Sequence, residues 1–178
     1  ENPKLGKHSH ARIYDMIKHA GVRADDEGNE HYEFFEHDLF GIDGPLSQFV
    51  EYFKAAAMGS DVGRRILLLY GPPSSGKSQL AILLKRGLEA YTRTDSGAVY
   101  AIAECPQHED PLNLMPHEER RNFRDETGIL IEGELCPRCA LNLHEKCHDD
   151  VYAVPVKRIT FSEKERRGIG TFVPSDPK

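Results

Sequence analysis

The chain has 178 residues, a formal net charge of −6 and four cysteines. This length suits one domain with a small appendage, and the negative charge disfavours nucleic acid as a bulk partner. No apolar run approaches the ~20 residues that a membrane-spanning helix needs, so we expect no membrane partner. The first residue is Glu1 rather than Met, and we therefore expect a piece of a longer protein.

Two helices are predicted in the first third of the chain. Apolar residues at helical spacing in 11–20, with a glycine directly after them, predict the first helix. The polar, acidic residues 23–30 predict a loop, and a dense aromatic and apolar patch follows at 34–42. Residues 45–58, with proline at the start and glycine after the end, predict the second helix.

The next segment has the pattern of a phosphate-binding loop. Residues 71–78, GPPSSGKS, match G-x-x-x-x-G-K-[ST] at every fixed position. The apolar run at 65–70 predicts a buried strand, and residues 79–91 have the apolar spacing of a helix. Strand, glycine loop and helix form the order that this motif needs, which disfavours a glycine turn that binds nothing.

The residue types explain how such a loop would bind ATP or ADP with Mg²⁺. Backbone N–H groups wrap the β-phosphate, and the two glycines permit a close approach that a Cβ would block. Pro72 and Pro73 donate no N–H, so the amides must come from residues 74–78. Lys77 is expected to reach the β- and γ-phosphates, and the Ser78 hydroxyl to bind Mg²⁺. The predicted nucleotide ligands of the loop are Gly71, Ser74, Ser75, Gly76, Lys77 and Ser78.

Beyond the loop helix the chain changes character. Residues 98–103 predict a second buried strand, and a later strand and an extended tail are predicted at 154–161 and 168–178. The segment 105–150, between the two predicted strands, is polar and rich in histidine, cysteine and charged residues. A helix is predicted within it at 117–125. The predicted divisions are 1–60, an N-terminal helical segment; 61–104, the nucleotide-binding core; 105–150, a Cys/His-rich insertion; and 151–178, a strand and its tail.

Two short motifs in the insertion have the spacing of metal-binding turns. Cys105 and His108 flank Pro-Gln, and Cys136 and Cys139 flank Pro-Arg. This spacing lets both side chains of a tight turn meet one tetrahedral Zn²⁺, so these four residues are the predicted ligands of a closed structural site. Cysteines in a chain without a secretory pattern favour metal or free thiols over disulfides.

A local ligand set is the alternative. It would join Cys136 and Cys139 to Cys147 and His148, or to His144 in place of His148. Free thiols in a polar insertion would need no metal. A redox role for Cys136 and Cys139 is disfavoured, because nothing around them has the pattern of a thioredoxin-like βαβ unit.

Longer blocks of sequence accompany these motifs. They are ARIYDMI at 11–17, FFEHDLFGI at 34–42, CPQHEDPLNLMP at 105–116, GELCP at 133–137 and GIGTFVPSDPK at 168–178. Together they resemble the N-terminal AAA+ ATPase domain of the bacterial PrkA serine protein kinase family, over nearly the whole chain.

The resemblance implies an α/β fold: a P-loop NTPase of AAA+ type with a parallel-sheet core, truncated and carrying a small zinc-knuckle insertion. It implies an ATP-binding module in the bacterial cytoplasm, whose parent is an ATPase or serine protein kinase with an unidentified protein substrate. A homo-oligomer of the full-length protein is compatible with it. The resemblance also makes Phe40, Gly41 and Ile42 the segment that packs on adenine.

The hydrolysis machinery of the family has no match in the chain. AAA+ hydrolysis needs an apolar strand that ends in acidic residues, and no arginine finger can be assigned. The strand predicted at 98–103 precedes a single Glu104 but comes too early in the AAA+ order, and 129–132 is too short. No catalytic residue is assigned, and we expect ATP binding without efficient turnover.

Two other functions stay open from the sequence. The first is a zinc-stabilised interaction module that recruits a protein partner while the nucleotide only orders the fold. The second is a P-loop kinase of a small metabolite, which would need several arginines aimed at phosphates. Arg120, Arg121 and Arg124 are the candidates, but they lie on a polar predicted helix and are expected to face solvent.

Overall fold

The computed structural model describes residues 6–26, 28 and 30–172 and divides into two units. Residues 7–91 form one unit, and the other contains Gly6 and the chain from Thr92 onward. The boundary falls inside the predicted nucleotide-binding core, so the phosphate loop and the strand predicted at 98–103 lie in different units. Within the described ranges, no helix has both the length and the apolar character that a bilayer crossing requires.

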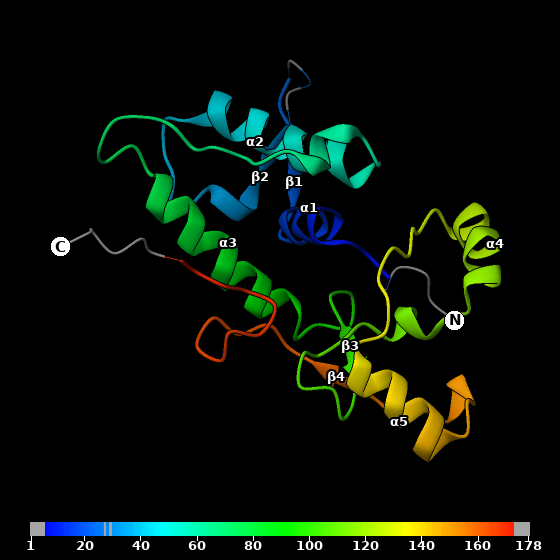
Figure 1. The fold of residues 1–178 in the computed structure, drawn as a ribbon. Helices are drawn as coiled ribbons and strands as arrows, with labels where there is room; N and C mark the ends of the chain where they lie inside the picture. Colours follow the sequence, from blue (N-terminus) through cyan, green and yellow to red (C-terminus); the bar gives the residue numbers. More distant parts are fainter. Residues whose placement is uncertain (1–5, 27, 29, 173–178) are drawn as a thin grey trace. The chain divides into compact units, whose positions relative to one another are not determined.

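Helices α1 (Ser9–His19), α2 (Asp43–Ala57) and α3 (Lys77–Tyr91) build the unit of residues 7–91 (Figure 1). Helix α1 packs against both α2 and α3. Each helix carries an apolar stripe, and the stripes meet around the fully buried Ile17 and Val50. The short 3₁₀ turn η3 (Asp61–Arg64) follows α2.

A β-hairpin lies where the sequence predicted a loop. Strand β1 (Val22–Ala24) pairs antiparallel with β2 (Glu30–Tyr32), and the 3₁₀ turn η2 (Glu33–Phe35) follows. The strands are short and mostly exposed. They therefore lack the alternation of apolar and polar residues that identifies a half-buried strand in a sequence.

The segment predicted as a buried strand before the phosphate loop is extended but unpaired. Ile66, Leu68 and Tyr70 are 95%, 80% and 94% exposed. A strand needs the N–H and C=O groups of a neighbour, and the described sheets pair only β1 with β2 and β3 with β4. The parallel-sheet core expected from the fold class is therefore not formed within the described ranges.

The unit that begins at Thr92 is built on one antiparallel strand pair and two helices. Strand β3 (Val99–Ile102) pairs with β4 (Val156–Ile159), with Val99 opposite Ile159 (Figure 1). Between them come η4 (Pro111–Leu114), α4 (His117–Thr127), α5 (Pro137–Cys147) and η5 (Val151–Ala153). Both strands were predicted, but their pairing is antiparallel rather than parallel.

Arg158 ties β4 to the turn that precedes β3. Its guanidinium contacts Asp95 Oδ1 at 2.9 Å and donates to the carbonyls of Arg93 and Thr94 at 2.9 and 2.6 Å. The tail was predicted to be extended, and residues 169–172 carry no helix or strand. The rest of the predicted tail, 173–178, lies outside the described residues.

Candidate nucleotide and metal sites

The phosphate loop turns sharply into α3. Ser74 and Gly76 have φ angles of 63° and 82°, in the left-handed region that favours glycine. The helix begins at Lys77, and Leu80 N donates to Gly76 O at 2.8 Å. The first N–H groups of a helix have no partner inside it, so the start of α3 offers backbone donors next to the loop.

Lys77 folds back over the loop that precedes it. Its ammonium donates to Gly71 O at 2.9 Å, Pro72 O at 2.6 Å and Ser75 Oγ at 2.8 Å. An ammonium has three protons to donate, and each has a neutral acceptor here. An anionic phosphate oxygen would be a stronger acceptor than any of these.

An open pocket of about 510 Å³ lies beside the loop, within the size range of small-molecule sites. Its lining joins the loop residues Gly71, Ser75, Gly76 and Lys77 to apolar side chains of α2 and of the segment before the loop, chiefly Ile42, Leu46, Phe49, Leu67 and Leu69. Neither Leu46 nor Phe49 was singled out from the sequence as a site residue, because both have the spacing of ordinary core residues.

The segment predicted to pack on adenine divides between the pocket and solvent. Ile42 lines the pocket, whereas Phe40 is 78% exposed and Gly41 turns the chain with a φ of 70°. A Cβ added at Gly76 would lie 3.8 Å from Ile42 Cδ1, so this segment lies against the phosphate loop. The Gln79 Nε2 to Asp38 Oδ1 hydrogen bond, 3.1 Å long, joins the same two segments.

Glu104, the acidic residue after the strand predicted at 98–103, takes part in a surface ion pair. Its Oε2 lies 2.6 Å from Lys146 Nζ, and this hydrogen bond lowers the pKa of Glu104. The carboxylate therefore ties the end of β3 to α5.

The cysteine-rich segment brings four ligand atoms together. The thiols of Cys105, Cys136 and Cys139 and a carboxylate oxygen of Glu109 all lie within 4.8 Å of one another. Cys105 follows β3, Cys136 is the N-cap of α5 and Cys139 lies in its first turn. The structure therefore assembles three of the four predicted zinc ligands, with Glu109 as the fourth member of the cluster.

Hydrogen bonds order this cluster. The Cys139 amide donates to Cys136 Sγ at 3.4 Å, and the Cys136 amide donates to Glu109 Oε1 at 2.9 Å. Burial raises the pKa of Cys139. Burial also raises the pKa of Glu109, but hydrogen bonds from the Cys139 and Cys136 thiols outweigh it, so this pKa lies below its usual value.

The predicted ligand His108 lies outside the cluster of four ligand atoms. Its backbone is left-handed, with a φ of 53°, and its amide donates to Cys105 O at 3.2 Å. The ring Nδ1 is buried, and no hydrogen-bond partner is found for it in the described part of the chain. Glu109 directly follows it in CPQHE, so spacing alone could have suggested both residues.

The alternative ligands on α5 also lie outside the cluster. His144 Nδ1 is 3.0 Å from Asp149 Oδ2, and His148 is the left-handed C-cap of the helix. Cys147 is half-buried at the end of α5. The structure therefore does not assemble the local set.

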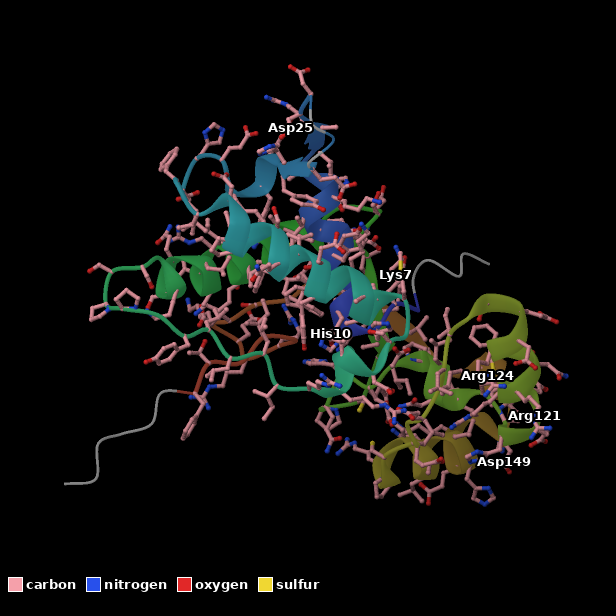
Figure 2. The ribbon with its side chains drawn as sticks, turned by 90° about the horizontal axis from the view of Figure 1, so that it is seen from above. Lys7, His10, Asp25, Arg121, Arg124 and Asp149 are labelled. Carbon is pink, nitrogen blue, oxygen red and sulfur yellow. The ribbon has the colours of Figure 1, made fainter. Side chains whose placement is uncertain are left out.

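Of the three arginines considered for a metabolite kinase, Arg121 and Arg124 face solvent as expected, whereas the Arg120 side chain is largely buried. Arg120 donates to the carbonyls of Met115, Gly133 and Asn113 at 2.9–3.2 Å, which holds the start of α4 against the following segment. Arg121 and Arg124 are exposed, and Figure 2 shows their side chains at the surface.

Comparison with known proteins identifies the family. The family described as PrkA AAA domain matches residues 1–178, the whole chain. The chain belongs to this family. A Bacillus subtilis relative named ATP-dependent protease PrkA is 52% identical over 179 residues, which cover all of this chain. An Escherichia coli K12 relative named serine/threonine kinase YeaG is 31% identical over 121 residues, 64% of this chain.

These two relatives are much longer than the chain, which spans 28% of the Bacillus protein and 18% of the Escherichia coli protein. A Lon protease of Cytophaga hutchinsonii is 30% identical over 77 residues, 43% of this chain and 10% of its own length. No solved structure matches. Family membership confirms the resemblance found in the sequence and implies a P-loop NTPase-like fold.

Proposed function

We propose that this chain is the ATP-binding module of a PrkA-type protein and binds Mg-ATP or Mg-ADP through residues 71–78. The supporting observation is Lys77, whose three protons are held by neutral oxygen atoms at the mouth of an apolar pocket. The Bacillus and Escherichia coli relatives bear the names of an ATP-dependent protease and a kinase. Both names denote proteins that use ATP.

Different residues of the pocket would bind different parts of the nucleotide. The amides of residues 74–78 and the Lys77 ammonium would bind the phosphates, and the Ser78 hydroxyl at the exposed start of α3 would bind Mg²⁺. Ile42 would pack on adenine, with Leu46 and Phe49 extending the apolar surface. Such a site combines the apolar wall and the few convergent polar groups typical of ligand pockets.

Substitution of Lys77 tests this proposal. Lys77→Ala removes the cationic contact and should weaken Mg-ATP binding by about 1.5–3 kcal/mol, the scale of a hydrogen bond to a charged group. Lys85→Ala removes a positive charge from the same helix α3 and is the matched control, with affinity close to that of the unmodified chain. Calorimetric titration measures both variants, and equal affinity for Lys77→Ala and the unmodified chain would overturn the proposal.

We also propose that the cysteine cluster holds one Zn²⁺ in a structural role. Three thiols and a carboxylate suit zinc, whose structural sites are four-coordinate and rich in cysteine. The apolar cluster around the thiols is small, with Ile102, Cys105 and Cys139 as its buried members, and small cores depend on such cross-links. Elemental analysis of protein purified without chelator should find stoichiometric zinc, and its absence would defeat the proposal.

The activity of the parent is a further part of the proposal. The names of the relatives support ATP-dependent action on a protein substrate, by phosphorylation or by proteolysis. A metabolite kinase is less well supported, because Arg120 uses its guanidinium to hold backbone carbonyls. Transfer of labelled phosphate from ATP to a protein by the full-length parent, or cleavage of that protein, would distinguish the two activities.

A further inference from the structure

We propose that Glu109 is the fourth ligand of the zinc site, so that the ion is held by three thiolates and a carboxylate. This inference rests on the proposed zinc site and differs from the sequence prediction, which placed His108 in the fourth position. Glu109 comes from the turn after β3, as Cys105 does, while Cys136 and Cys139 come from the start of α5. A shared ion would cross-link these two segments.

The spacing of the ligand atoms fits a tetrahedral ion. With Zn–S bonds of about 2.3 Å, neighbouring sulfur atoms around a tetrahedral zinc lie roughly 3.8 Å apart. Cys105 Sγ and Cys136 Sγ are 3.9 Å apart, and Cys105 Sγ lies 4.0 Å from Glu109 Oε2. The cluster therefore needs only a small adjustment to surround one ion.

The charge of the cluster also calls for a cation. Three thiolates and one carboxylate are all anionic ligands, and a divalent cation bound among them would offset their charge. In the described structure, Glu109 takes its hydrogen bonds from amide and thiol groups, including Asn113 Nδ2 at 3.4 Å, and pairs with no lysine or arginine. A divalent ion would supply the missing positive charge.

The second oxygen of Glu109 is well placed to orient the carboxylate. The Cys136 amide lies 2.9 Å from Oε1 and 3.1 Å from Oε2. Zinc could take one oxygen while the amide retains the other, which is how outer hydrogen bonds commonly fix a ligating carboxylate. His108 is placed less well, because the ligand atoms that come together belong to Cys105, Glu109, Cys136 and Cys139 and include no ring nitrogen of His108.

Two neighbouring substitutions separate the candidates. Glu109→Gln keeps an oxygen that can accept from the Cys136 amide but removes the anionic ligand. His108→Asn removes the imidazole, and asparagine tolerates the left-handed backbone at this position. We expect Glu109→Gln to lower zinc affinity at least about tenfold and His108→Asn to leave it close to that of the unmodified chain, as measured by competition with a chromogenic chelator.

Cobalt substitution gives a second readout that does not depend on affinity. With Co²⁺ in the site, thiolate-to-metal absorption should persist in Glu109→Gln because the three thiols remain, while the d–d bands shift with the changed fourth ligand. In His108→Asn both features should match the unmodified chain. This comparison distinguishes an altered ligand set from an unfolded unit.

The outcomes are distinct. Zinc lost from His108→Asn but kept by Glu109→Gln would overturn the inference and restore the ligand set predicted from the sequence. Equal retention in both variants, or equal loss, would also overturn it, because Glu109 would then have no special role. Absence of zinc from the unmodified chain would instead defeat the proposed zinc site itself.

Discussion

Gly87 lies where α3 contacts two side chains of the core of its unit. A Cβ at this position would lie 2.6 Å from Phe34 Cε2 and 2.7 Å from Met16 Sδ. Met16 is buried, and the Phe34 ring packs edge-on against Phe35 at 5.0 Å, so both neighbours are constrained. We expect Gly87→Ala to lower the free energy of unfolding by about 1–3 kcal/mol, although alanine is favoured over glycine in helices by about 1 kcal/mol.

Gly44→Ala is the matched control for this prediction. Gly44 also lies in a helix, α2, but nothing lies within 4 Å of a Cβ added there. The control should be neutral or stabilising by about 0.4–1 kcal/mol. Urea denaturation measures the free energy of unfolding of both variants. Hydrogen exchange of the α3 amides then reports the local stability of this helix. If Gly87→Ala were as stable as Gly44→Ala, the contact with Phe34 and Met16 would not be restrictive.

Among the elements, helices α1 to α4 and the strands at 99–102 and 156–159 were predictable because their local sequence patterns indicate them. The pairing of these strands could not be predicted, because the partner of a strand is set by residues far away in the sequence. Strands β1 and β2 pair in an exposed hairpin, although the local sequence of neither one predicts a strand. In the cysteine cluster, spacing identified the three thiols that the structure brings together. It selected His108 as the fourth residue, whereas the structure places a carboxylate oxygen of Glu109 beside the thiols.

The segment 66–70 keeps strand-like alternation without a strand partner. Leu67 and Leu69 are each 38% exposed and line the pocket together with Leu68, whereas Ile66 is 95% exposed and is not a lining residue. Exposed apolar segments with free backbone groups promote self-association. We expect Ile66→Lys to reduce association of the isolated chain, measured by light scattering, while Mg-ATP affinity is retained because Ile66 is not among the residues that line the pocket.

Leu141→Lys is the control for this element. Leu141 is 53% exposed on α5, so the substitution adds the same charge at an apolar surface position outside the unpaired segment. It should change light scattering much less than Ile66→Lys does. Equal reduction by both variants would attribute the effect to net charge rather than to residues 66–70.

For the whole molecule, the division into two units predicts separate responses to zinc removal. The cysteine cluster lies in the unit that begins at Thr92, while the phosphate loop lies in the unit of residues 7–91, which has its own core of apolar and aromatic side chains. Metal binding contributes to folding wherever the unfolded chain has no preformed site. Zinc removal should therefore increase hydrogen exchange in β3, α5 and the segment between them, but not in α1, α2 or α3.

The nucleotide affinity provides the second half of this prediction. Zinc is removed with a zinc-selective chelator, Mg²⁺ is restored, and Mg-ATP binding is titrated calorimetrically. The affinity should stay close to that of the untreated chain, because the loop and its pocket are formed entirely by residues 42–80. Lys77→Ala gives the converse result, with zinc retained and nucleotide affinity lost. Loss of nucleotide binding on zinc removal would contradict independent sites, and it would show that the Thr92 unit must be folded for the phosphate loop to bind.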